Sequence, residues 1–117
     1  MRRELRLKSS KDFARVYSQG KSKANKYLVL YYLNQDSAEP TKVGFSIGKK
    51  IGSAVRRNKL KRQLKAIISE QIEAIKPGFL LVFIVRRSAR DLEFPQLKAS
   101  AFDLLKRTNI FVGSACA

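Results

Sequence analysis

Histidine is absent from the 117-residue sequence, and the only cysteine is Cys116, next to the carboxyl terminus. Imidazole and thiolate groups are the usual zinc ligands, and imidazole is the most common general base, so a zinc site and histidine-based catalysis are both excluded. The 9 Asp and Glu residues are scattered and include no close pair suited to holding two metal ions. We therefore predict no catalytic side chain, no metal ion bound by the protein and no organic cofactor.

A single cysteine cannot form an intrachain disulfide, which is typical of proteins of the reducing cytosol. Long apolar segments are missing as well. The longest, FLLVFIV at residues 79–85, is far shorter than the roughly 20 residues that a membrane-spanning helix needs, and the amino terminus lacks the apolar core of a signal peptide. The sequence therefore predicts a cytoplasmic protein with no membrane partner.

Acidic residues are scarce, because 9 Asp and Glu stand against 25 Lys and Arg and give a net charge of +16. A compact chain with this charge repels itself, and a phosphate backbone relieves the repulsion while releasing counterions. A histone-like tail could be equally basic. Here, however, 44% of the residues are hydrophobic and basic residues alternate with core-forming ones. We therefore predict one folded domain, residues 1–117, that binds RNA or DNA.

Hydrophobic spacing predicts an α+β fold with helices packed on a sheet. Ser9 and Asp12 have the spacing of a capping box at the start of the first helix. The strand at 41–50 is expected to run antiparallel to the strand at 26–33, and the strand at 79–85 is apolar enough for a central or parallel position. The predicted segments are a loosely ordered basic arm at 1–8, helices at 9–20, 53–75 and 95–107, strands at 26–33, 41–50 and 79–85, and an uncharged, possibly flexible tail at 108–117.

The densest basic segment is VRRNKLKRQLKA at 55–66, inside a stretch from Glu39 to Glu70 that has no acidic residue between its ends. Such a segment is commonly just the solvated face of a helix. Two features argue against that interpretation. The helix has no ion pairs of i,i+4 spacing in its first turns, and basic residues at its start oppose the helix dipole. An anionic partner is therefore favoured, and the candidate binding residues are Arg56, Arg57, Asn58, Lys59, Lys61, Arg62 and Lys65.

Three aromatic residues are candidates for stacking against unpaired bases. Phe13 and Tyr17 share one face of the first helix, and Tyr31 lies on a strand. The alternative is that these rings belong to the core. The residues alone favour that alternative for Phe13, whereas the hydroxyl groups of Tyr17 and Tyr31 favour partly solvated positions.

The stretch VGFSIGKKIGSAVRRNKLKRQLKA at 43–66 resembles the signature of the protein component of bacterial ribonuclease P, and KDFARVYSQGKS at 11–22 supports the resemblance. The likeness extends over about residues 5–107. It implies a two-layer α-β-β-β-α-β-α sandwich with a left-handed β-α-β crossover, as in a ribosomal protein domain, and an extra short strand near 21–24. General rules of chain connection favour the opposite hand.

The resemblance also implies a function. The protein would assist ribonuclease P RNA in removing the 5′ leader of precursor tRNA, and hydrolysis would belong to the RNA and its Mg²⁺ ions. The motif helix would bind that RNA, with Arg57, Asn58 and Lys59 in the places of the family's Arg-Asn-Arg. Lys59 departs from the family and lacks the planar fork of arginine. The implied leader cleft consists of Phe13, Tyr17, Tyr31, Ser46, Lys49, Lys50 and Arg86.

Two other functions stay open at this point. One is a non-catalytic ribosomal or ribonucleoprotein assembly protein of similar fold, which would have a basic surface without stacking rings. The other is a helix-turn-helix DNA binder. It is the weaker alternative, because strands rather than a second helix flank the basic helix, and no DNA partner is predicted.

Overall fold

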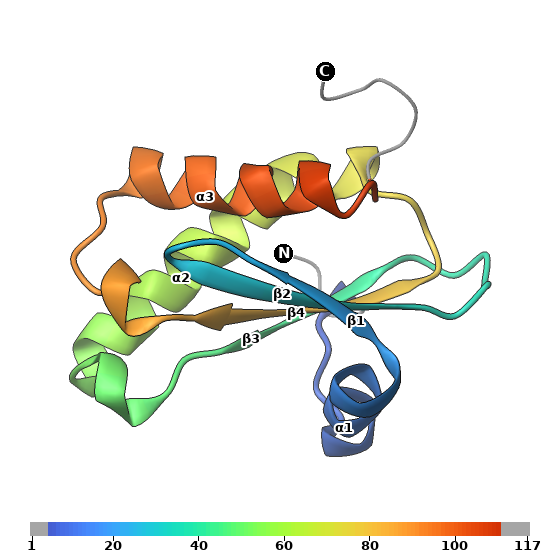
Figure 1. The fold of residues 1–117 in the computed structure, drawn as a ribbon, viewed down its shortest axis with the longest axis horizontal. Helices are drawn as coiled ribbons and strands as arrows, with labels where there is room; N and C mark the ends of the chain where they lie inside the picture. The colour runs from blue at the N-terminus through green and yellow to red at the C-terminus, as the bar shows by residue number, and fades with distance from the viewer. Residues whose placement is uncertain (1–4, 111–117) are drawn as a thin grey trace.

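The computed structural model describes residues 5–110, which form a four-stranded sheet with three helices packed on it. The strands lie side by side in the order β1-β2-β4-β3 (Figure 1). The elements are α1 (Ser10–Gln19), β1 (Lys21–Ala24), β2 (Leu28–Asn34), β3 (Lys42–Ser46), α2 (Ala54–Gln71), β4 (Phe79–Val85) and α3 (Phe94–Arg107), with 3-10 turns η2 (Lys49–Ile51), η3 (Ile72–Ala74) and η4 (Arg87–Ala89).

The mixed α+β fold and the short strand near 21–24 are confirmed, whereas the position of β3 was not foreseen. β3 runs opposite to β2, but β4 lies between them and pairs antiparallel with β2 and parallel with β3. β4 is apolar on both faces and mostly buried, so it gains most from the central position. β3 is also shorter than predicted. Lys49 and Lys50 lie in η2 beyond its end.

The two faces of the sheet are covered unequally (Figure 1). α2 and α3 lie on one face, where Leu64, Ile67, Phe83 and Leu104 belong to a large continuous core. α1 lies on the opposite face, where Val16, Val82, Leu80 and Leu7 form a small second cluster. Side chains of β2 alternate between the faces, because Leu28 and Leu30 face α2 and α3 while Tyr31 and Leu33 face α1.

Both predicted flexible ends need correction where the structure describes them. In the arm, Leu5 and Leu7 are buried, Arg6 forms a parallel bridge with Val43, and the amide of Leu7 donates to the Val43 carbonyl at 3.0 Å. In the tail, Ile110 is fully buried, and its carbonyl accepts from the amide of Lys76 at 2.7 Å. The arm is ordered here because its apolar side chains, Leu5 and Leu7, are buried against the rest of the protein. Residues 1–4 and 111–117, including Cys116, lie outside the described residues.

The starts of α1 and α2 differ in how they are capped. The Ser53 hydroxyl caps α2 and accepts from the amide of Arg56 at 3.3 Å. The capping box predicted for α1 does not form, because the Ser9 side chain makes no cap hydrogen bond and Asp12 lies 3.8 Å from Arg15 instead. The end of α1 is tight. A Cβ on Gly20 would lie 2.6 Å from the Tyr32 carbonyl oxygen, so this turn accepts only glycine.

Candidate nucleic-acid interface

The three predicted aromatic residues meet on the α1 face of the sheet. The ring centroids of Tyr17 and Tyr31 are 5.1 Å apart in an edge-to-face arrangement, and those of Phe13 and Tyr17 are 6.3 Å apart. Tyr17 is 42% exposed, whereas Phe13 is half-buried and packs on Gly44, where a Cβ would approach its ring to 2.6 Å. Phe13 therefore helps to hold α1 on the sheet, and Tyr17 offers its ring to solvent.

The strands extend this aromatic surface toward the open end of the face. Directly opposed strand residues point to the same side, so the Tyr31 row of the sheet is followed by a row of Ala24, Val29, Ile84 and Ser46. All four are half-buried or exposed, whereas Val82 in the preceding row is fully buried. Ser46, predicted for the cleft, therefore lies beside a shallow apolar floor that α1 leaves uncovered.

Predicted cations lie where these strands end. Lys49 and Lys50 are exposed in η2, just beyond β3. Arg86 is exposed after β4, and its guanidinium donates to the Asn25 carbonyl at 2.9 Å. That single hydrogen bond fixes the arginine at the sheet edge and leaves its other donors available. Among residues 5–110, none of these three cations has a carboxylate partner within 4.0 Å.

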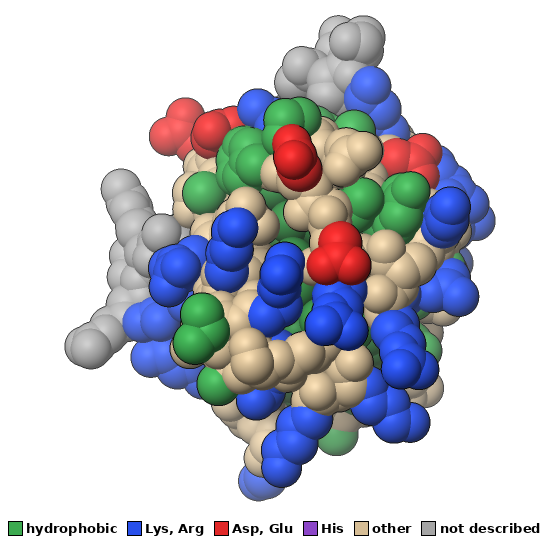
Figure 2. Space-filling view, turned by 90° about the vertical axis from the view of Figure 1, so that its left-hand side faces the viewer, with side chains coloured by type: hydrophobic (Ala, Val, Ile, Leu, Met, Phe, Trp, Pro, Cys, Tyr) green, Lys and Arg blue, Asp and Glu red, His purple; other side chains and the backbone are tan. Residues whose placement is uncertain are grey.

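The basic flank of α2 is a second surface. Asn58, Lys59, Lys61 and Arg62 are exposed, and Lys65 is half-buried. In the described part of the chain these four cations make no ion pair. Figure 2 looks onto the end of the molecule where η2 and the start of α2 lie, and Lys and Arg side chains dominate the view. Phosphate groups are the natural partners of such a surface.

The first two arginines of the motif are partly engaged within the protein. Arg57 is half-buried, and its Nε donates to the Gly52 carbonyl at 3.3 Å, across the start of α2. Arg56 donates to the Arg90 carbonyl at 3.4 Å and lies 3.8 Å from the Asp91 carboxylate. Arg56 therefore also ties α2 to the segment before α3, a role that the sequence did not suggest.

One cation near α2 was missed by the sequence analysis. Arg6, in the arm, lines a hollow with Lys61 and Lys65. Burial lowers the pKa of Lys65, and the positive charges of Lys61 and Arg6 lower it further. The alternation of Leu5, Arg6 and Leu7 is the signal that could have revealed a strand-like segment here.

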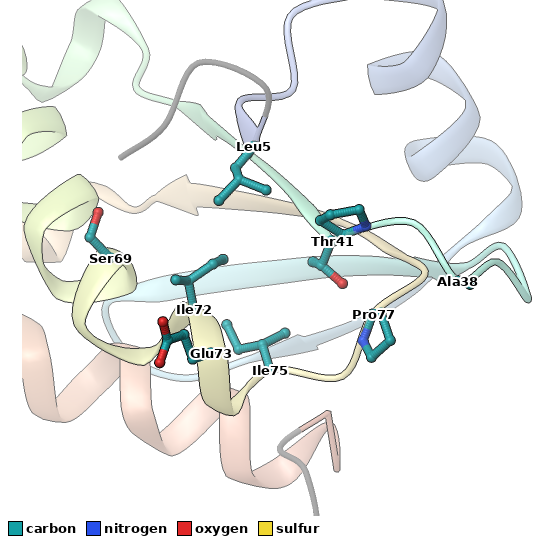
Figure 3. Close-up of a pocket in the computed structure, with 9 residues that line it drawn as sticks. Leu5, Ala38, Thr41, Ser69, Ile72, Glu73, Ile75 and Pro77 are labelled. Carbon is teal, nitrogen blue, oxygen red and sulfur yellow. The ribbon is translucent and has the colours of Figure 1, made fainter.

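The described residues also contain a hollow that holds no predicted site residue. It has a volume of about 560 Å³, and Leu5, Ile72, Ile75 and Pro77 border it together with Thr41 (Figure 3). Within residues 5–110, no group of three His, Cys, Asp or Glu side chains could hold a metal ion. No helix in that part of the chain is long and apolar enough to span a membrane.

Comparison with known proteins gives matches along nearly the whole chain. Residues 1–109 match the family model described as Ribonuclease P. The chain is 45% identical to the ribonuclease P protein component of Clostridioides difficile, over 91% of this chain and 93% of that protein. It is 39% identical to that of Bacillus velezensis, over 98% of both. The structure of the Staphylococcus aureus RNase P protein superposes with a TM-score of 0.86 and 32% identity, over 92% of this chain and 98% of that one.

Proposed function

Because this chain belongs to the ribonuclease P protein family, we propose that its α2 surface binds ribonuclease P RNA and that its α1 face holds the 5′ leader of precursor tRNA. The chain is the protein subunit of this tRNA-processing ribonucleoprotein enzyme. The edge-to-face contact of an exposed Tyr17 with Tyr31 is the observation that carries the leader assignment. Tyr17 keeps a large part of its surface in solvent in this arrangement.

The α1 face suits a single strand rather than a duplex. Unpaired bases stack on exposed rings, and each stack contributes roughly 1–3 kcal/mol. Tyr17 supplies such a ring, and the floor of Val29 and Ile84 gives the strand an apolar bed. Lys49, Lys50 and Arg86 lie at the end of this floor, where they can neutralise the phosphates of the same strand.

The α2 surface suits a folded RNA. Its cations are spread around the surface of the helix and lack acidic partners among the described residues, so the interaction we propose is with phosphates rather than with base edges. The strands that precede and follow α2 leave no second helix in the position that a helix-turn-helix DNA binder needs. We therefore propose RNA, and neither DNA nor a membrane, as the partner.

Phosphodiester hydrolysis, in this proposal, belongs to the RNA. Mg²⁺ held by the RNA would activate the attacking water and stabilise the leaving oxygen. This chain's part is to position the leader and to neutralise phosphates that would otherwise repel the substrate. The carboxylates of the described residues support this division, because they are dispersed and four of them are paired with Lys or Arg. We place this activity in the cytoplasm.

The alternative of a ribosomal or assembly protein is not favoured by the family match. It also leaves the exposed Tyr17 ring without a role.

Reconstitution tests the proposal. The full chain is added to ribonuclease P RNA, and cleavage of leader-bearing precursor tRNA is followed across a range of Mg²⁺ concentrations. We expect the chain to lower the Mg²⁺ concentration needed for cleavage and to raise the affinity for leader-bearing substrate. Without the RNA, we expect it to cleave nothing. Unchanged Mg²⁺ dependence and substrate affinity at moderate salt would show that the proposal is wrong.

A further inference from the structure

The arm and α2 meet at the free edge of β3. Arg6 pairs with Val43 in a parallel bridge, so its side chain lies on the same side of the sheet as Val43, the side that α2 covers. Leu7 points to the other side, where a Cβ on Gly44 would touch it. The bridge therefore turns Arg6 toward α2 and uses Leu7 to hold the arm in place.

Between them lies a hollow of about 290 Å³ that contains only positive charge. Arg6, Lys8, Lys61 and Lys65 line it, and within residues 5–110 no acidic residue does. Asp12 and Glu39 lie in a neighbouring hollow that Arg6 and Lys8 also line. Neither carboxylate comes within 4.0 Å of a cation of the first hollow among the described residues. Like charges therefore gather here without a counter-ion from the described part of the chain.

One side chain that lines this hollow has a donor without a partner. The Nε of Arg6 is shielded from solvent and makes no hydrogen bond to any of residues 5–110. Buried donors are nearly always paired, and a charged donor is the most unfavourable kind to leave alone. The half-buried Lys65 also lacks a negative partner among the described residues. Burial and the charges of Lys61 and Arg6 lower its pKa. A bound anion would supply the missing acceptor and offset the repulsion.

We propose that the hollow formed by Arg6, Lys61 and Lys65 binds one phosphoryl group, so that the arm and α2 grip it together. Guanidinium offers two parallel hydrogen bonds to such a group, and the lysines act as point charges. The ligand is a phosphodiester of the bound RNA or a free phosphate ion. The RNA source rests on the proposed function, whereas the free-ion source does not.

Titration of the full chain with sodium phosphate at constant ionic strength tests the site without RNA. The arginine Nε–H resonances are followed by NMR, and Arg6→Lys identifies the resonance of Arg6. We expect a saturable shift of that resonance, while the resonance of Arg15, which faces Asp12 at 3.8 Å, stays in place.

The second part of the experiment measures binding to ribonuclease P RNA. Arg6→Gln is expected to lower the slope of log affinity against log salt by about 0.7–0.9, the value of one lost phosphate contact. Arg6→Lys keeps the slope, and Lys106→Gln, on the exposed end of α3, leaves it unchanged. Hydrogen exchange of the Leu7 amide shows whether the arm of each variant stays docked on Val43.

The phosphate titration and the RNA-binding series distinguish a free phosphate ion from a phosphodiester of the RNA. A response to phosphate with an unchanged RNA slope assigns the site to the free ion, and a changed slope assigns it to the RNA. If the Arg6 resonance ignores phosphate and a docked Arg6→Gln variant keeps the wild-type slope, the proposal is overturned. Failure of the cleavage reconstitution alone would leave the phosphate titration standing, so the two hypotheses fail separately.

Discussion

The two faces of the sheet differ in how completely they are covered. The face under α2 and α3 contains a core of 18 buried residues, whereas the face under α1 contains a cluster of 4. The same strands supply both. β4 places Leu81 and Phe83 in the first and Leu80 and Val82 in the second. The face under α2 and α3 therefore supplies most of the stability of the fold. The face under α1 can then leave Tyr17 and the apolar floor partly in solvent.

The largest expected effect breaks this comparison through the core. Leu64→Ala on α2 and Leu7→Ala on the arm remove the same atoms from the two faces, and both leucines are buried. We expect Leu64→Ala to lower the free energy of unfolding by about 3–5 kcal/mol, because the surrounding core cannot collapse into the space. Leu7→Ala is expected to cost about 2 kcal/mol, since the arm can shift. Denaturant titration measures both, and equal losses would contradict the division of labour between the faces.

A smaller effect concerns the uncovered face. Tyr17→Ala is expected to weaken binding of leader-bearing precursor tRNA by roughly 1–3 kcal/mol, because it removes one stacking ring, while stability changes by less than about 0.5 kcal/mol. Fluorescence binding assays compare leader-bearing and mature tRNA. The matched variant Tyr17→Phe keeps the ring and should bind almost as the wild type does. If Tyr17→Ala weakens both tRNAs equally, the ring does not contact the leader.

The covered face was largely predictable and the uncovered one was not. Spacing alone predicts a buried helix face made of Leu60, Leu64, Ile67, Ile68, Ile72 and Ile75, and all of them are buried except Ile72, which is half-buried. Spacing does not say which strands become neighbours. The apolar sequence of β4 predicted a central or parallel position, and this is confirmed. It did not predict that β4 separates β2 from β3, because pairing depends on which strand gains most from two partners.

The arm shows the same limit at the level of single residues. The basic residues of the arm predicted a loosely ordered segment. Leu5 and Leu7 are buried instead, and they direct Arg6 toward α2. The residues involved are far apart in sequence, since Arg6 forms a bridge with Val43 and lines one hollow with Lys61 and Lys65. Which residues of α1 and α2 lie on the same helix face was predictable, because a helix presents its residues at fixed spacing. The hollow between the arm and α2 was not, because it depends on a pairing of distant segments.

A third effect compares the two helices on the covered face. α2 carries unpaired cations, whereas α3 uses Lys98 and Arg107 in ion pairs with Glu70 and Asp103 at 3.0 and 3.4 Å. We expect Arg62→Gln to lower the salt slope of RNA binding by about 0.7–0.9, because one phosphate contact is lost. Lys106→Gln removes an equal charge from α3 as the control. Filter binding over a salt series measures both, and equal slopes for the two variants would show that only net charge matters.

The smallest effect tests the one departure from the family signature. Lys59 is exposed on α2 and makes no ion pair within residues 5–110. Lys59→Arg restores the planar fork, and a bidentate phosphate contact is stronger than a point-charge contact. We expect RNA affinity to rise about threefold, roughly 0.6 kcal/mol, with the salt slope unchanged because the charge is unchanged. Leader discrimination should stay constant, since Tyr17 lies on the other face of the sheet. Titrations of the wild-type chain and of Lys59→Arg with RNA and with leader-bearing tRNA measure RNA affinity and leader discrimination separately. A rise in leader discrimination rather than in RNA affinity would place Lys59 against the substrate and join the two surfaces into one.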